Sequence, residues 1–488
     1  MIKKIGKCLV LLALCTSFLT ACGDPGAQTV YEVSPTPPPE SSPASSPPPP
    51  PESAPSQGVE LSPAADLTTV SLRPWAVDSL AAIRARDDVA LYVRSDGLYA
   101  ADLLTGEEIC LDASSLVATG IPRVTQFSFS LELSADHKLA AYTKGAALFL
   151  VPVDFDGPPC EPRLLCEEVG QAGYVFAAGA FLYAPASGGL YTYDLSDGHG
   201  DLFLDGSCAY TELVAAPEKL YAVRRGDDAE GVVEIDLSDR SASMIVLNEL
   251  VEPGVGTLHP PIGVSADGRY FYLIGRTRSG SISTDGVSVA VYDSHAQTYT
   301  PLDFPSLQRS ENFSIHPTDG TLAFMHGVGR EMTNENKTLR LWDPAAKKMT
   351  SVSDEDSGGA MNPCFSHDGQ KLVYSAGKSF ADYDYVAASV ALERNGEYYE
   401  QHGIWEYSLT TGRNTRITDT GFAMWPRYID QDRALCYVRL NGDAYDLYVY
   451  EDGVERLAVA GIPDYDYSDN HGFFNLTPIL RISSSWNG

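Results

Sequence analysis

The sequence predicts an all-β protein, a β-propeller of about eight four-stranded blades preceded by a disordered, proline-rich tether, with seven blades as the alternative. Two short sequence motifs, called marks below, recur in a fixed order, and helical periodicity is almost absent from residues 66–488, called the body below. One mark is a tight turn between apolar strands, and the other is a strand that ends in an acid, as in Thr338-Leu-Arg-Leu-Trp-Asp343. Repeats of about 40–50 residues with four short strands are typical of propeller blades.

The strand-end mark is an apolar or aromatic residue followed by an acid and a turn, at Ala101-Asp102, Val153-Asp154, Tyr193-Asp194, Ile235-Asp236, Tyr292-Asp293, Trp342-Asp343 and Tyr450-Glu451. Tyr407-Ser408 lacks the acid. The turn mark stands at Ser134-Ala-Asp136, Ser265-Ala-Asp-Gly268, Pro317-Thr-Asp-Gly320 and Ser366-His-Asp-Gly369. Asp-Gly supplies the positive φ that a tight hairpin needs, so these turns are expected to join neighbouring strands.

The repeated turns and strand-end acids predict a single propeller domain, with a short C-terminal extension, over residues 66–488. The blades are expected to begin near Leu80, Gln126, Gly173, Thr211, Pro261, Asn312, Asn362 and Trp425. The third, fourth and eighth are the weakest, because the Asp-Gly turn is replaced by Ala177-Ala178-Gly179, Ala216-Pro-Glu218 and Asp430-Gln-Asp432. Seven blades therefore remain an alternative.

Together, the Asp-Gly turn and the strand-end acid resemble the WD-repeat-like propellers of the TolB family and the non-catalytic propeller of prolyl oligopeptidase-type peptidases. The resemblance covers most of the body. It implies the fold and leaves the function open, since one fold carries many functions.

The chain begins like a secretory signal, with an apolar run from Cys8 to Leu19 that follows Lys3, Lys4 and Lys7. The run is too short for a stable membrane span. It ends in Leu19-Thr-Ala-Cys22-Gly23, which resembles the bacterial lipobox. That resemblance implies that residues 1–21 are removed, that Cys22 carries the lipid, and that the protein is anchored on the extracytoplasmic face of the cell membrane. Ordinary secretory cleavage near the same place is the alternative.

Residues 22–65 are expected to form a disordered linker after the lipidated cysteine. Pro, Ser and Glu dominate this segment, and Pro47 to Pro51 is unbroken. So little apolar surface cannot repay the entropy of ordering. At ~3.1 Å per residue, a polyproline II segment of this length would hold the body on the order of 100 Å from the lipid.

The acidic charge limits the classes of partner. The net charge is −31, and removal of residues 1–21, with three lysines and no acid, would make it −34. Such a charge argues against nucleic acid and against a body surface that lies on anionic lipid. Membrane contact is therefore expected only through the lipid anchor, and the body is expected to be monomeric.

Six cysteines remain after Cys8, Cys15 and Cys22 are set aside. Cys160 and Cys166 flank a turn, so a local disulfide between them is open. Cys364 and Cys436 stand in apolar strands and are expected to pack as small hydrophobes.

Three adjacent long loops predict the ligand-binding rim. In propellers of this family, the loops between second and third strands open on the same face as the connections between blades. They are short in the early blades and grow to Arg276–Gly286, His326–Lys337 and Ala376–Gly403 in the fifth to seventh. The candidate site residues from these loops are Arg276, Arg278, Arg330, Glu331, Asp382, Tyr383, Asp384 and Tyr385.

Three residues from the segments between blades complete this candidate site, because those segments should lie near the central channel. They are Asn362, Met424 and Trp425. The alternative is that the loops are long surface hairpins and that Trp425 covers a blade edge, since most aromatic residues of a propeller pack between its sheets.

The sequence predicts no catalytic residues, cofactor or metal. Gly-x-Ser-x-Gly, His-Glu-x-x-His and a phosphate-binding glycine loop are absent. His259, His326 and His402 fall near the rim and could bind a metal with Asp382 or Asp384, but no ligand spacing supports such a site. The acidic tail from Asp464 to Asp469 departs from a calcium loop and is expected to be a solvated turn.

These features favour a cell-surface lipoprotein whose propeller binds a peptide, glycan or envelope protein at the rim. One alternative is a propeller-type polysaccharide lyase or hydrolase, which requires His, Arg and acid to converge at the channel mouth. Another is an accessory or sensor subunit of an envelope complex.

Overall fold

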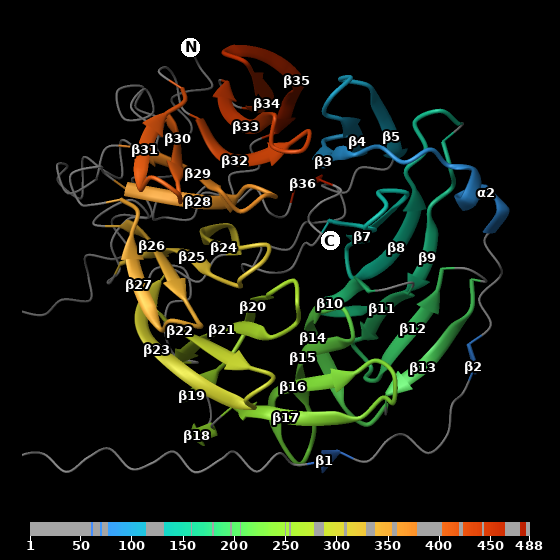
Figure 1. The fold of residues 1–488 in the computed structure, drawn as a ribbon. Coiled ribbons are helices and arrows are strands. Elements are labelled where there is room, and N and C mark those ends of the chain that lie inside the picture. Colours follow the sequence, from blue (N-terminus) through green and yellow to red (C-terminus); the bar gives the residue numbers. More distant parts are fainter. Residues whose placement is uncertain are drawn as a thin grey trace, which may run out of the picture. The chain divides into compact units, whose positions relative to one another are not determined.

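Eight four-stranded antiparallel blades form a ring in the computed structural model (Figure 1). The chain is therefore an eight-bladed β-propeller, which confirms the predicted fold class and decides against seven blades. The structure describes residues 60–61, 69–70, 77–113, 131–157, 159–177, 180–195, 198–204, 206–248, 250–252, 255–277, 287–306, 310–327, 337–353, 359–377, 403–418, 423–441, 444–463 and 479–484. Helix in these ranges is limited to α2 (Val77–Ala82) and η1 (Ser310–Asn312), and none of their helices could cross a membrane.

Each blade runs from an innermost strand near the ring axis to an outermost strand at the periphery (Figure 1). Blade 1 consists of β36 (Leu480–Ser484), β3 (Asp88–Arg94), β4 (Gly97–Asp102) and β5 (Glu108–Asp112), and blade 2 consists of β6 (Glu132–Leu133), β7 (Leu139–Lys144), β8 (Ala147–Pro152) and β9 (Arg163–Cys166). Blade 3 consists of β10 (Val169–Ala177), β11 (Ala180–Pro185), β12 (Leu190–Asp194) and β13 (Gly200–Leu204), and blade 4 consists of β14 (Ala209–Ala215), β15 (Lys219–Arg225), β16 (Glu230–Asp236) and β17 (Ala242–Leu247).

Blade 5 consists of β20 (Pro261–Val264), β21 (Tyr270–Thr277), β22 (Val287–Asp293) and β23 (Thr298–Ser306), and blade 6 consists of β24 (Phe313–Ile315), β25 (Leu322–His326), β26 (Thr338–Asp343) and β27 (Lys348–Ser351). Blade 7 consists of β28 (Gly359–Phe365), β29 (Lys371–Gly377), β30 (Gly403–Ser408) and β31 (Arg413–Arg416), and blade 8 consists of β32 (Ala423–Ile429), β33 (Ala434–Asn441), β34 (Ala444–Glu451) and β35 (Val454–Pro463).

Four short strands extend these sheets. β1 (Glu60–Leu61) pairs with β17 at the outer edge of blade 4, and β2 (Thr69–Val70) pairs with β13 at the outer edge of blade 3. In blade 5, β18 (Leu250–Glu252) pairs with β19 (Val255–Leu258), which also pairs with β21. β1 belongs to the segment predicted as a linker, so at least these two linker residues pair with the body.

Blade 1 differs from the predicted one. Its first strand was expected near Leu80, but the chain forms α2 there, and the innermost strand is β36 from the C-terminal residues expected to be an extension. β36 pairs with β3 in the register from Asp88↔Ser484 to Tyr92↔Leu480. The two ends of the propeller thus share one sheet, which closes the ring and leaves β3 without a free edge.

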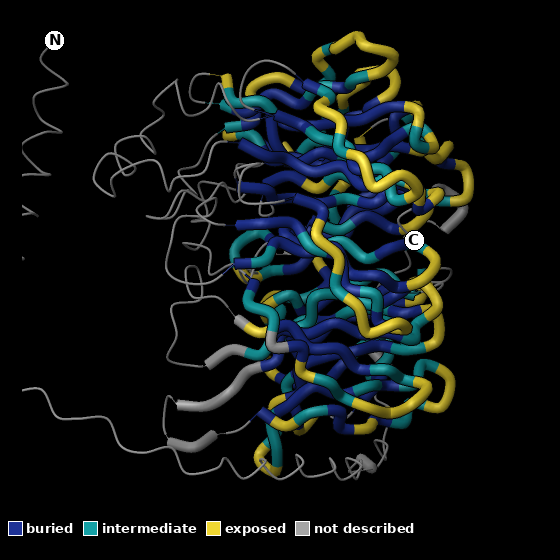
Figure 2. The backbone as a smooth tube through the Cα atoms, turned by 60° about the vertical axis from the view of Figure 1, so that its left-hand side comes forward, coloured by how far each residue is buried: buried dark blue, intermediate teal, exposed yellow. Residues whose placement is uncertain are grey.

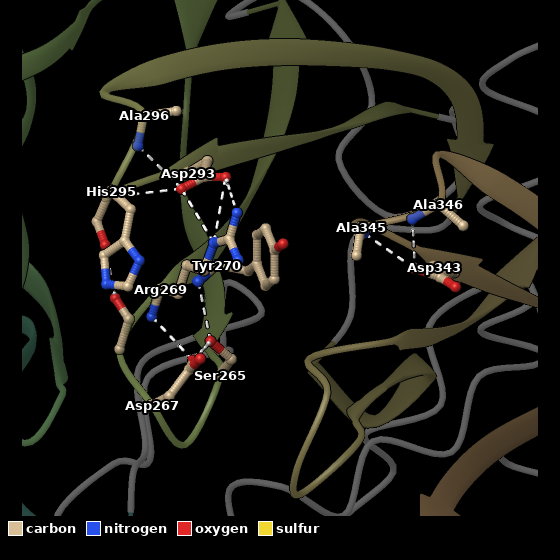
Figure 3. A network of polar contacts seen from close by, with 12 residues as sticks. Ser265, Asp267, Arg269, Tyr270, Asp293, His295, Ala296, Asp343, Ala345 and Ala346 are labelled. Atoms are coloured by element: carbon tan, nitrogen blue, oxygen red, sulfur yellow. Dashed lines mark hydrogen bonds and ion pairs between the residues drawn. The ribbon is translucent and has the colours of Figure 1, made fainter.

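The turn mark joins the first and second strands of a blade. In blade 5, Ser265 Oγ donates a hydrogen bond to Asp267 Oδ1 (2.6 Å) and accepts one from Tyr270 N (2.8 Å; Figure 3). The same Ser–Asp bond forms at Ser134 and Ser366 in blades 2 and 7. The hydroxyl and carboxylate satisfy backbone groups that a tight turn leaves unpaired, which explains why these residue types recur.

The strand-end acid caps the hairpin between third and fourth strands. Asp293 Oδ1 accepts hydrogen bonds from His295 N (3.0 Å) and Ala296 N (3.1 Å), and Asp343 does the same for the two residues after Pro344 (Figure 3). Ser408, which stands where the acid is missing, accepts from Thr411 N through its hydroxyl (3.2 Å). These three hairpins therefore share a side-chain oxygen at the end of the third strand that accepts a backbone N–H of the turn.

His316 and His367 lie in turns between first and second strands, and both also connect neighbouring blades. His316 Nε2 lies 2.9 Å from Gly369 O, and His367 Nδ1 lies 2.6 Å from Asp432 Oδ1. A Cβ atom at Gly369 would lie 2.4 Å from His316 Nε2, and the φ of this residue is 68°. Glycine is thus needed there both for the turn and for the contact between blades 6 and 7.

Aromatic residues fill the space between blades, as expected. Tyr221 of blade 4 stacks on Phe271 of blade 5 with ring centroids 4.0 Å apart, and both residues are fully buried. Seen from the side, buried strands occupy the interior and exposed turns the margin (Figure 2). Each such pair stabilises the ring through a large buried area and a favourable ring geometry.

No disulfide joins any of the described cysteines. Cys160 and Cys166 are not bonded to each other, so the disulfide that the sequence left open is not formed in this structure. Cys166 Sγ instead lies 3.0 Å from Glu168 O. Cys436 is fully buried, as expected of a cysteine that packs as a small hydrophobe.

Candidate ligand-binding site

The long loops leave the sheet where the sequence placed them. They connect β21 to β22, β25 to β26 and β29 to β30, the second and third strands of blades 5, 6 and 7. We call the face that carries these loops and the connections between blades the loop face. Of the predicted rim residues, Arg276 has its backbone described, in β21 paired with Leu258. The others lie outside the described residues, namely Arg278, Arg330, Glu331, Asp382, Tyr383, Asp384 and Tyr385.

Asn362 lies in the innermost strand of blade 7, as predicted for a residue near the ring axis. It is 2% exposed and has a φ of 53°, at a β-bulge between Met361 and Cys364. Its Oδ1 accepts a hydrogen bond from Ser375 Oγ at 2.8 Å. Asparagine tolerates the left-handed region better than most residues, and here its side chain also holds the bulge against β29.

Met424 and Trp425 occupy the matching place in blade 8. Trp425 has a φ of 57° at a bulge between Met424 and Arg427. Trp425 is 5% exposed and, with Met424, belongs to the core shared by blades 8, 1 and 2. Its indole Nε1 is buried and has no hydrogen-bond partner among the residues that the structure describes. Of the two roles that the sequence left open for Trp425, this burial favours packing.

A left-handed residue in a bulged innermost strand is a recurring feature. Ala172 in β10 and Glu212 in β14 have φ values of 43° and 55° at the corresponding bulges of blades 3 and 4. Such a backbone costs roughly 1–2 kcal/mol in a residue other than glycine. None of these residues is a glycine, so nothing in the local sequence indicates a positive φ at these positions.

A polar relay that the sequence did not reveal runs on the loop face from the exposed Arg225 of blade 4 to the buried His259 between blades 4 and 5. Arg225 Nε lies 3.3 Å from Glu230 Oε1, which accepts from Asn248 Nδ2 at 3.2 Å. Asn248 Oδ1 lies 3.0 Å from His259 Nδ1. Because the amide nitrogen of Asn248 already donates to Glu230, His259 Nδ1 must be the donor, which fixes the tautomer of this imidazole.

His259 is expected to make the protein less stable in mild acid. Burial lowers the pKa of His259 from 6.5 to about 4. Between these pH values, the unfolded chain binds a proton that the folded chain does not. The contribution of neutral His259 to the free energy of unfolding is therefore fully present above pH 6.5 and is lost as the pH falls toward 4. The loss of unfolding free energy should reach the order of 3 kcal/mol. Burial also lowers the pKa of His137 and of His326, so both histidines should likewise lower stability as the pH falls.

Urea unfolding at pH 7.0, 5.5 and 4.5 measures this effect, with His259→Gln as the variant that cannot titrate. The variant should be less stable than wild type at pH 7.0 and should show a smaller fall in stability between pH 7.0 and 4.5. An unchanged slope would mean that His259 does not control the acid sensitivity.

Within the described ranges, no group of three or more His, Cys, Asp or Glu side chains could hold a metal ion. His259 and His326 are described there, whereas His402 and both proposed aspartates are not. The absence of a cofactor stays a prediction.

No family model matches the chain, and no curated protein matches its sequence. Among solved structures, it is similar to an oligogalacturonate lyase in complex with manganese (12% identity, 76% of this chain, 85% of that chain, TM-score 0.41). It is also similar to TolB from Acinetobacter baumannii (12%, 77% and 78%, 0.34) and to a prolyl endopeptidase (13%, 79% and 52%, 0.42). The predicted resemblance to the propellers of TolB and of prolyl endopeptidases is thus found among solved structures, and it concerns the fold alone.

Proposed function

We propose that this protein is a lipid-anchored, extracytoplasmic binding protein whose propeller holds a ligand on the loop face of blades 5 to 8. The observation that carries the proposal is the set of long connections between the second and third strands of blades 5, 6 and 7, which leave three adjacent blades on one face. Loops on a rigid scaffold are the usual place for binding residues.

The composition of the innermost strands favours binding over catalysis. The eight innermost strands as described contain no histidine, and their only charged residues are Glu132, Glu212, Arg427 and Arg481. Glu132 and Arg481 form an ion pair with each other at 3.5 Å. A lyase or hydrolase in the channel would need an acid–base pair there, whereas a binding site needs donors, acceptors and apolar surface.

Replacing residues 378–402 by a short turn containing Asn-Gly should leave the propeller folded and remove ligand binding. Ala376 and Gly403 are already paired in the sheet, so a tight turn can join β29 to β30. Shortening a loop saves closure entropy of about 0.6 kcal/mol per halving of its length. Binding to glycan and peptide arrays and to isolated cell-wall sacculi, together with the melting temperature, provides the measurement.

The matched control places Asn-Gly at Ser95-Asp96, the corresponding loop of blade 1, and should bind like wild type. If wild type binds no array member or sacculus, or if the shortened variant binds as well as wild type, the proposed function is wrong.

Cys22→Ala should move the protein from the membrane fraction to the soluble fraction. The lipid is the only membrane attachment that the proposal contains, since a body of this acidity is repelled by anionic lipid. Fractionation followed by immunoblotting measures the change, and Cys15→Ala, within the signal, is the matched control that should remain with the membrane. A Cys22→Ala protein that still sediments with membranes would exclude the lipid anchor.

A further inference from the structure

The loop-side end of blade 6 gathers basic side chains on one face of its sheet. His326, the last residue of β25, is paired with Thr338 in β26, and Phe324 is paired with Arg340. Directly opposed residues of an antiparallel pair project to the same side, and so do residues two apart on one strand. His326, Thr338 and Arg340 therefore share a face.

That face meets blade 5. The Phe324 ring stacks on Phe304 of β23 with centroids 6.2 Å apart, and Gly327 N donates to Pro305 O at 3.1 Å. His326 lies beside Phe324, with ring centroids 6.2 Å apart. The three polar residues thus stand at the junction of blades 5 and 6, where the loops of both blades begin.

Among the described residues, few partners use the hydrogen-bonding groups of His326 and Arg340. Arg340 Nε donates to Thr338 Oγ1 at 3.2 Å, and within the described part of the chain no carboxylate forms an ion pair with Arg340. His326 contacts the Phe324 ring and has no hydrogen-bond partner in the same part of the chain. Both residues are partly exposed, so solvent or a ligand can reach them.

Among the described residues, the charged side chains that act on His326 are basic, although the chain as a whole is strongly acidic. Burial, and then the charges of Arg340 and Lys337, lower the pKa of His326. Lys337 is 1% exposed and lies directly before β26. In a chain with 65 acidic and 34 basic residues, most exposed arginines would be expected to face a carboxylate.

We propose that His326, Thr338 and Arg340 form a subsite for one carboxylate group of the ligand, at the junction of blades 5 and 6. This inference rests on the proposed function and names the chemistry of its ligand. A guanidinium presents a planar fork of donors that matches two carboxylate oxygens. The Thr338 hydroxyl accepts from Arg340 and can donate onward, and the neutral imidazole adds an N–H. A single arginine, with no carboxylate partner among the described residues, matches a monoanion better than a phosphate dianion.

Histidine side-chain NMR on the full mature chain tests the subsite, with His326→Gln used to assign the resonance. Two probe pairs isolate the carboxylate: sodium glucuronate against glucose, and N-acetylglycine against N-acetylglycinamide. We expect at least one of the two acids to shift the His326 resonance saturably and both neutral partners to leave it unchanged. Which acid does so distinguishes a sugar acid from a peptide terminus as the source of the carboxylate.

Arg340→Gln keeps the length and polarity of the side chain while it removes the charge, and it should weaken binding of the active acid by about tenfold, since hydrogen bonds to charged groups are among the stronger ones. Arg413→Gln, an exposed arginine of blade 7, is the matched control and should change the affinity less than twofold. Melting temperatures of both variants show whether they are folded.

The subsite is wrong if neither acid perturbs His326, if inorganic phosphate binds as tightly as the active acid, or if Arg340→Gln and Arg413→Gln bind it equally. These results are separate from the array experiment. An array ligand that needs the 378–402 loop, without any effect of the acids on His326, would remove the subsite alone. Acid binding at His326 without any array or sacculus ligand would retain the subsite and remove the proposed function.

Discussion

A chain that ends at Ile479 is expected to lose cooperative folding, because it lacks the strand that closes the propeller. β36 forms five paired positions with β3, and its Leu480 is 2% exposed. Deletion removes the buried side chain of Leu480, worth about 2–5 kcal/mol, a smaller contribution from the partly buried Ile482, and ladder hydrogen bonds worth about 1 kcal/mol each. The expected loss of about 5–10 kcal/mol is comparable to the whole stability of a typical domain.

A chain that ends at Ser484 is the matched control, since it keeps β36 and removes only residues 485–488. Thermal unfolding followed by circular dichroism should give a sharp transition for the control and a broad or absent one for the shorter chain. Adding a peptide of residues 479–488 should restore part of the transition. Equal melting temperatures for the two truncated chains would show that β36 does not hold the ring together.

The blades could be predicted because their marks are local. The Ser265–Asp267 bond and the Asp293 cap each satisfy backbone groups within five residues, so each leaves a signature in a short stretch of sequence. Units without Asp-Gly remained doubtful for the same reason. In blade 8, the turn is made by Asp430, Gln431 and Asp432, all with positive φ and none of them glycine.

The ring closure could not be predicted in the same way. β36 pairs with a strand almost four hundred residues earlier in the chain, and no turn joins the two. Five residues without a turn mark carry too weak a pattern to be called a strand of a distant blade. The repeat order alone therefore suggested an inner strand near Leu80, where the chain forms α2.

The candidate site could be predicted only in outline. Loop lengths correctly indicated which strand ends carry long connections, but seven of the proposed rim residues lie outside the described ranges, and their membership of a site stays a prediction. The bulges at Asn362 and Trp425 depend on tertiary packing, since tryptophan is rare at positive φ and asparagine is common in many other conformations. The grouping of His326 with Arg340 requires the strand register, which the sequence does not give.

Trp425→Ala is expected to lower the free energy of unfolding by about 3–5 kcal/mol, the usual cost of emptying a large aromatic site in a core. Trp425 is 5% exposed and packs in the core that joins blade 8 to the closing blade 1. A cavity there weakens the same junction that β36 completes. The left-handed backbone at this position does not relieve the loss, because alanine pays a similar cost for a φ of 57°.

Two further substitutions separate the contributions of ring volume, indole N–H and backbone. Trp425→Phe keeps most of the volume and removes a buried N–H that has no partner, so it should cost only about 1 kcal/mol. Trp425→Gly should be no less stable than Trp425→Ala, since glycine adopts a positive φ freely and this offsets its larger entropy when unfolded. Urea unfolding of the three variants, together with their affinity for the array ligand that wild type binds, decides the role of the ring. A Trp425→Ala protein with unchanged stability and weakened affinity would place Trp425 on the binding surface, because only a ring that contacts the ligand would produce that result.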